Sequence, residues 1–132
     1  MTDTITKLGR LTKRSEFLHV REGAYQAKGG LVIQMRESLI QNDPPRQCRV
    51  GFTATKKVGN AVVRNRAKRR MREVARALLP SYGLAGYDYV FIARNTTTQR
   101  PFERLLDDGT KALLRLRESV NKHSQTQITN KD

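Results

Sequence analysis

The spacing of apolar residues along the chain predicts a succession of short helices and strands. A first helix is expected over residues 16–21, capped at its start by Ser15 and ended by Gly23. Residues 24–28 and 31–36 have the composition of two strands separated by a glycine pair, which predicts a hairpin. The first third of the chain is therefore expected to fold as a helix followed by two paired strands.

The longest periodic segment predicts a helix over residues 61–79. At about 100° per residue, its apolar side chains form one stripe that can pack on a sheet: Val63, Ala67, Met71, Val74, Ala75 and Leu78. The helix is expected to stop at Pro80, because proline lacks the N–H group that continues a helix.

Two further strands flank this helix. Residues 49–55 alternate, so that Val50, Phe52 and Ala54 share one face, and residues 87–93 have the nearly continuous apolar character of a central strand. The strand–helix–strand unit predicts an α/β domain, an α+β sandwich with a mixed sheet, in the order α-β-β-(β)-α-β-α. A loop is expected over residues 42–45, Asn-Asp-Pro-Pro.

The remaining segments complete one domain. A last helix is predicted over residues 102–120, opened by Pro101. We expect a flexible basic arm over residues 1–14, a folded domain over 15–120 and a disordered polar tail over 121–132. A chain of 132 residues is long enough for one core.

Charge changes this picture by pointing to a partner. The formal net charge is +14 and the isoelectric point is near 10.8, which makes nucleic acid the leading partner and an anionic membrane surface the second. No apolar run approaches the roughly 20 residues that span a bilayer, and the N-terminus lacks the apolar segment of a secretory signal. Cys48 is the single cysteine, which fits a reducing, cytoplasmic location.

The positive charge is concentrated in residues 56–76, which hold nine Lys or Arg residues against one acid, Glu73. Partners for intrahelical ion pairs are almost absent, so the repulsion favours a polyanion over a merely solvated face. Arginine suits forked contacts to phosphates. The apolar stripe carries small residues and no Trp or Phe to enter lipid, which argues against the membrane alternative.

Catalytic chemistry by protein groups is not indicated. His19 and His123 have no ligands at metal-binding spacing, and Cys48 has no base beside it in the sequence. Asp107 and Asp108 are adjacent on a helix and point in different directions. We expect no catalytic residue and no metal ligand in the protein.

The segment KKVGNAVVRNRAKR, residues 56–69, closely resembles the signature of the protein subunit of bacterial ribonuclease P. Similarity extends to the N-terminal segment around residues 10–17, to RVGFTATKK and to DYVFIAR, and covers residues 8–117. The resemblance implies an α/β sandwich with a left-handed β-α-β crossover, against the usual right-handed rule. It also implies that the protein joins a large catalytic RNA to remove the 5′ leader of precursor tRNA.

The same resemblance implies partners and sites. The partners are the catalytic RNA subunit and precursor tRNA, with Mg²⁺ held mainly by the RNA, no membrane and no obligate protein partner. The arginine-rich motif that faces the RNA corresponds to Lys56, Lys57, Asn60, Arg64, Asn65, Arg66, Lys68, Arg69 and Arg72. The cleft that binds the leader corresponds to Phe17, Gln34, Thr53 and Thr55, with Arg64 and Asn65 near its end.

The leader cleft departs from the family pattern at two positions. Many members carry a second aromatic residue shortly after the first-helix phenylalanine, where this chain has Val20-Arg21, and an aromatic in the first core strand, where it has Gln34. Stacking is therefore expected to rest mainly on Phe17, with a core role for Phe17 as the open alternative. Two other functions stay open. One is an rRNA-binding ribosomal protein, which shares the size, charge and fold class of this chain, and the other is a protein-only nuclease.

Overall fold

A mixed five-stranded sheet forms the centre of the molecule. The computed structural model describes residues 7–40 and 47–130, and its strands lie in the order β1-β4-β5-β3-β2. They are β1 (Lys7–Arg10), β2 (Ala24–Lys28), β3 (Leu31–Glu37), β4 (Gln47–Thr53) and β5 (Tyr87–Ala93). The first three strands in this order run parallel, and β3 is antiparallel to both β5 and β2. The predicted α/β domain with a mixed sheet is confirmed.

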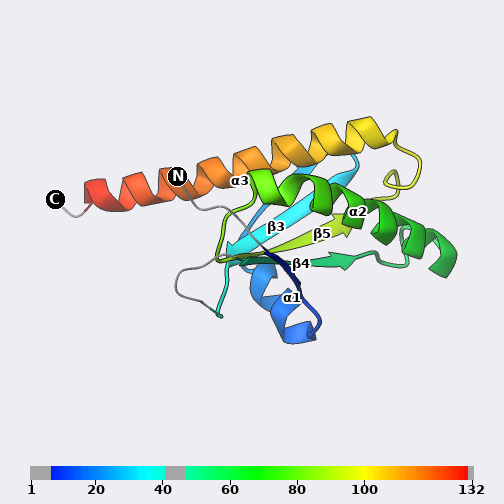
Figure 1. Ribbon diagram of the computed structural model, residues 1–132, viewed down its shortest axis with the longest axis horizontal. Helices are drawn as coiled ribbons and strands as arrows, with labels where there is room; N and C mark the ends of the chain where they lie inside the picture. The colour runs from blue at the N-terminus through cyan, green and yellow to red at the C-terminus, as the bar shows by residue number, and fades with distance from the viewer. Residues whose placement is uncertain (1–6, 41–46, 131–132) are drawn as a thin grey trace.

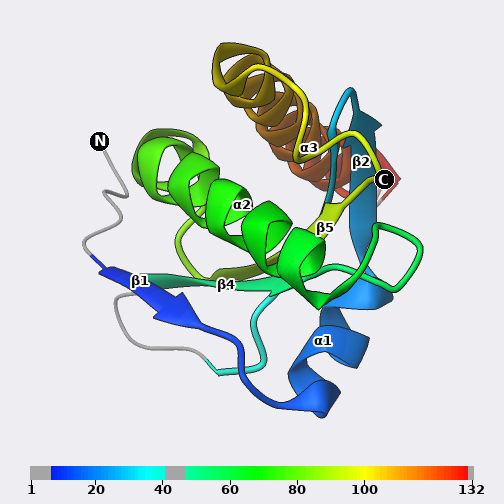
Figure 2. The same cartoon turned by 90° about the vertical axis from the view of Figure 1, so that its right-hand side faces the viewer.

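Three helices cover the two faces of the sheet unequally. Helices α2 (Ala61–Tyr82) and α3 (Phe102–Asn130) lie on one face and α1 (Arg14–Arg21) lies on the other (Figures 1 and 2). The larger core lies under α2 and α3 and includes most of the predicted stripe, since Ala67, Met71, Val74, Ala75 and Leu78 are buried there. A smaller cluster under α1 contains Leu11, Val20 and Val90, with Phe17 and Ile92 packed against it.

The hairpin of β2 and β3 is confirmed with its glycine turn. Gly29 has a φ of 54°, a left-handed conformation that glycine adopts without steric cost. The two strands pair so that Lys28 opposes Leu31 and Ala24 opposes Met35. This register fixes which side chains of β2 share a face with those of β3.

Several predicted boundaries were wrong. The residue before α1 is Lys13, and Ser15 lies within the helix instead of capping it. Helix α2 continues through Pro80 to Tyr82, because a proline in the last turn removes only one helical bond and the next one, from the Gly83 N–H to the Leu79 carbonyl, still forms at 2.8 Å.

Two other differences concern the ends of the chain. Helix α3 continues to Asn130 instead of ending at Val120, so residues 121–130, predicted to be a polar tail, lie in the helix. Strand β1 was not predicted, because its short sequence has no periodicity and its partner β4 lies far along the chain.

Strand β4 ends at Thr53 and not at residue 55, and the predicted loop over 42–45 lies outside the described residues. The handedness of the crossover stays a prediction.

Candidate nucleic-acid interface

The basic face of α2 begins at a well-defined helix start. The Asn60 side chain accepts a hydrogen bond from the Val63 N–H at 3.0 Å, so this residue of the motif also caps the helix. Lys56 and Lys57 are exposed in the turn that precedes it. Further along, the exposed polar side chains of α2 that continue this basic surface are Asn65, Arg66, Arg69, Arg72 and Arg76.

The cations of α2 are not equally free to bind a ligand. Arg64 is half-buried and donates from Nη1 to the Gly59 carbonyl at 3.0 Å, and Lys68 is also half-buried. Arg70 donates to the Thr97 carbonyl at 2.7 Å and lies 6.0 Å from the centre of the Phe102 ring. Arg70 therefore attaches α2 to the rest of the domain, and the outer arginines form the accessible surface.

These outer charges have no acidic partner in the described part of the chain. The ion pairs found there join Arg49 to Glu16 and Asp88, Arg100 to Asp108, and Lys111 to Asp107, and none involves a side chain of α2. A face of unpaired guanidinium groups on one rigid helix matches the spaced charges of a phosphate backbone.

The opposite face of the sheet brings three of the four predicted cleft residues together. Gln34 pairs with Val90 and Val90 pairs with Gly51, so these positions form one row across the sheet on the face that carries α1. The Phe17 ring lies directly over Gly51, since a Cβ atom there would meet Cε2 and Cζ of the ring at 2.5 Å. Thr53 lies on the same face at the end of β4.

The side chains at these predicted cleft positions are only partly covered. Phe17, Gln34 and Thr53 are all half-buried, and Thr55 is exposed in the turn after β4. Phe17 packs against the small cluster under α1 but keeps part of its surface accessible. The geometry therefore allows Phe17 to support α1 and to present an apolar surface to a ligand.

Tyr25 is a residue of this face that the sequence interpretation missed. It pairs with Gln34 across the hairpin, so the two side chains lie on the same face of the sheet. The residue is 65% exposed, and it is the one exposed residue among the eight Phe and Tyr residues of the chain, all of which the structure describes. A two-residue turn at Gly29-Gly30 places residues 25 and 34 opposite one another, so counting outward from that turn would have found it.

Arg49 also lies on this face, but it is not free to bind a phosphate. It donates to both carboxylate oxygens of Asp88, from Nε at 3.0 Å and from Nη2 at 2.7 Å, and to Glu16 from Nη1 at 2.8 Å. The hydrogen bond to Asp88 is the main reason that the pKa of Arg49 is raised. The second Glu16 oxygen accepts the N–H groups of Lys13 and Thr12, which lowers the pKa of Glu16. This ion-paired cluster fixes the start of α1 on the sheet.

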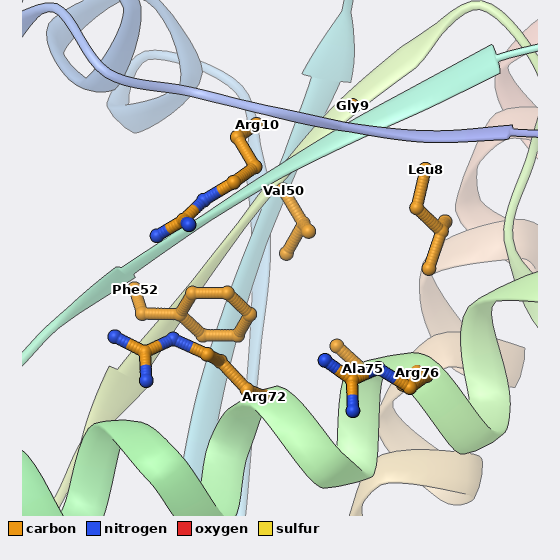
Figure 3. Close-up of a pocket in the computed structure, with 8 residues that line it drawn as sticks. All are labelled: Leu8, Gly9, Arg10, Val50, Phe52, Arg72, Ala75 and Arg76. Carbon is orange, nitrogen blue, oxygen red and sulfur yellow. The ribbon is translucent and has the colours of Figure 1, made fainter.

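A small cavity lies on the other side of the sheet, between β1, β4 and α2. Its volume is about 200 Å³. Figure 3 shows β1 above it and α2 below it, with side chains from all three elements directed into the space. It is lined by Leu8, Gly9, Arg10, Val50, Phe52, Arg72, Ala75 and Arg76.

The side chains that could support catalysis or metal binding, Cys48 and His19, are buried or hydrogen-bonded within the fold. Cys48 is buried, and burial raises the pKa of its thiol to about 12. His19 donates from Nε2 to the Glu37 carbonyl at 2.9 Å, while Arg36 donates to the His19 carbonyl at 3.0 Å. In the described residues no three His, Cys, Asp or Glu side chains are grouped to hold a metal ion, and no helix is long and apolar enough to cross a membrane.

Comparison with known proteins identifies close relatives. The profile of the family described as Ribonuclease P matches residues 5–124. The chain is 51% identical over 110 residues to the "Ribonuclease P protein component" of Caulobacter vibrioides, which covers 83% of this chain and 72% of that protein. It is 50% identical over 107 residues to the protein of the same name from Ruegeria pomeroyi, covering 80% and 84%. The solved RNase P protein from Thermotoga maritima superimposes with a TM-score of 0.65 at 26% identity, covering 80% of this chain and 96% of that one.

Proposed function

The chain belongs to the ribonuclease P protein family, and from this premise we propose how its two faces act in the holoenzyme. It is the protein subunit of ribonuclease P, the endoribonuclease that forms the 5′ end of tRNA from its precursor, and the family implies association with the ribonuclease P RNA. The protein supplies binding surfaces. Bond cleavage and the Mg²⁺ ions that it needs belong to the RNA.

The basic face of α2 binds the catalytic RNA. The observation that carries this proposal is the run of exposed arginines, headed by Arg66, Arg69 and Arg72, that has no carboxylate partner in the described part of the chain. Each guanidinium that contacts a phosphate releases a counterion, which favours binding and makes it sensitive to salt. Lys56, Lys57, Asn60, Arg64, Asn65 and Lys68 extend the same surface around the start of the helix.

The face that carries α1 binds the leader of precursor tRNA. The floor of β3, β5 and β4 beside α1 is buried or half-buried, with the half-buried Phe17 and the exposed Tyr25 available to stack on unpaired bases. Gln34, Thr53 and Thr55 supply hydrogen-bonding groups along this floor. Strand β4 ends at Thr53, only a short turn before the basic start of α2, so a strand lying in the cleft runs toward the motif and the catalytic RNA.

Reconstitution tests this function. The protein is mixed with its cognate ribonuclease P RNA and precursor tRNA at a Mg²⁺ concentration too low for the RNA alone. We expect accurate leader removal that depends on both components. Absence of any stimulation would refute the role as subunit, and cleavage by the protein without RNA would refute the assignment of catalysis to the RNA.

Leader binding is tested by comparing precursor tRNA with mature tRNA. Loss of one stacked base costs about 1–3 kcal/mol, so Phe17→Ala and Tyr25→Ala should each weaken binding of the precursor by roughly 5- to 150-fold and leave mature tRNA almost unchanged. Tyr25→Phe is the matched control because it keeps the ring. Equal losses for both ligands, with a lower melting temperature for Phe17→Ala, would assign that residue to the core alone.

A further inference from the structure

The cavity between β1, β4 and α2 lies on the opposite face of the sheet from the proposed leader cleft. Val50 and Phe52 point from β4 toward α2, whereas Gly51 and Thr53 face the side of α1. Strand β1 closes one side of the cavity and is held in place through the buried Leu11, whose N–H donates to the Val50 carbonyl at 3.1 Å. The cavity therefore has a fixed frame of backbone around it.

Three arginines surround this small space. Arg10 comes from β1, and Arg72 and Arg76 come from α2, and all three are exposed. Figure 3 shows Arg10 and Arg72 directed toward the same phenylalanine, Phe52. None of the three forms an ion pair within the described residues. Like charges converging on a cavity of about 200 Å³ repel one another, and a bound anion removes that repulsion.

The floor of the cavity is apolar, which a site for phosphate alone would not need. It is formed by Leu8, Val50, Phe52 and Ala75. Phe52 is half-buried, and its ring is fixed by the Phe91 ring, with the two centres 5.8 Å apart and tilted by 54°. A fixed aromatic ring beside arginines is the combination that proteins use to hold an unpaired base together with its phosphate.

We propose that this cavity binds one unpaired nucleotide of the ribonuclease P RNA. The base lies on the apolar floor around Phe52, and Arg10, Arg72 and Arg76 bind the adjoining phosphates. The cavity is smaller than the roughly 300–1,000 Å³ typical of sites for drug-sized molecules, so it has room for one base but not for a stack of bases, and the phosphates lie outside it beside the arginines. Arg72 and Arg76 continue the basic face of α2, so this source of the nucleotide rests on the proposed binding of the RNA subunit to that face.

The first experiment uses the free protein and three small probes. Adenosine 5′-monophosphate, ribose 5-phosphate and inorganic phosphate are titrated while amide NMR signals of β1, β4 and α2 are followed. We expect shifts centred on the cavity and binding of the nucleotide at least about fivefold tighter than that of ribose 5-phosphate, because only the nucleotide brings a base. Equal affinities for the two would overturn the base site, as would shifts located elsewhere.

Variants then separate the two parts of the site. Phe52→Leu keeps an apolar side chain but removes the ring, so binding of the nucleotide should weaken about fivefold or more while binding of inorganic phosphate is unchanged. Arg10→Met combined with Arg76→Met should weaken all three probes. Arg115→Met, an exposed arginine of α3, is the matched control and should bind all probes as the parent does. Thermal unfolding confirms that each variant is folded before it is titrated.

The holoenzyme distinguishes the source of the nucleotide. Arg10→Met with Arg76→Met should weaken binding to the ribonuclease P RNA by about tenfold or more in the absence of tRNA, and should leave the ratio of affinities for precursor and mature tRNA unchanged. A changed ratio with intact RNA-subunit binding would instead assign the nucleotide to the leader and overturn the proposal. If the Arg69→Ala variant also binds the RNA normally, the proposed binding of the RNA to the basic face of α2 is wrong. The probe titrations of the free protein still test whether the cavity binds a nucleotide.

Discussion

Replacement of Asp88 by asparagine tests whether the ion-paired cluster of Glu16, Arg49 and Asp88 holds α1 on the sheet. The side chain of Asp88 is 1% exposed and that of Arg49 is 13% exposed, so the two charges interact with little screening by water. Asparagine has nearly the same shape as aspartate. It carries no charge, however, and it turns one of the two acceptor atoms into a donor that faces the guanidinium.

The magnitude follows from what Arg49 loses and what it keeps. Removing one partner of a buried ion pair costs about 3–5 kcal/mol, because the other charge remains buried without compensation. Arg49 still contacts Glu16 at 2.8 Å, and that carboxylate is 18% exposed, so the lower end of this energy range applies. We expect a loss of about 3 kcal/mol in the free energy of unfolding. At about 4 °C per kcal/mol for a chain of this length, the melting temperature should fall by about 12 °C.

The assay is thermal and urea unfolding of the free protein, with Asp107→Asn as the matched control. Asp107 also forms an ion pair, with Lys111 at 2.9 Å, but its side chain is 59% exposed and that of Lys111 is 55% exposed. An exposed pair one helical turn apart contributes only about 0.3–0.5 kcal/mol, so this control should melt within about 2 °C of the parent.

A double variant gives the sharpest check. If Asp88→Asn is destabilising because it leaves Arg49 without its partner, then adding Arg49→Met should restore part of the lost stability, since the stranded charge is gone. Equal melting temperatures for Asp88→Asn and Asp107→Asn, or a further large loss in the double variant, would refute the reasoning.

Four further outcomes follow from single side chains. The pKa of Glu16 is lowered mainly because backbone N–H groups at the start of α1 donate to its carboxylate. The ionised carboxylate therefore stabilises the fold above the ordinary pKa of glutamate, and this stabilisation is lost as the pH falls through the lowered pKa. Urea unfolding between about pH 6 and pH 3 should show a smaller loss of stability for Glu16→Gln than for the parent. Gly51→Ala would place a Cβ atom 2.5 Å from the Phe17 ring, so it should cost about 1–3 kcal/mol of stability and reduce the preference for precursor tRNA, measured by unfolding and by filter binding. Arg69→Ala should reduce by about 1 the slope of log affinity for the RNA against log salt, and an unchanged slope would count against a phosphate contact. The Cys48 thiol, buried and with its pKa raised to about 12, should resist alkylation near pH 8 until the protein unfolds, as followed by mass spectrometry.

The sequence was sufficient for the elements whose residues interact locally. The stripe of apolar side chains on α2 is set by the helical repeat, so this helix was predicted with its buried face. The hairpin at Gly29-Gly30 is set by its turn, so its two strands were predicted as a pair. The two ends of α2 differ. The Asn60 side chain caps the start of the helix. The helix continues through Pro80 because this proline lies in the last turn, where the loss of one backbone hydrogen bond is tolerated.

The sequence by itself determined that this protein carries a rigid, basic helix on an α/β domain, because charge density and periodicity are properties of neighbouring residues. Only the tertiary structure decided which charges are available. Arg49 is neutralised by Asp88, which lies on a different strand, and Arg70 is bound to the carbonyl of Thr97, whereas Arg72 remains open beside a cavity that exists only because β1 pairs with β4. Such partners come from segments far apart in the chain, and no local pattern records which distant segment will pack against a given residue.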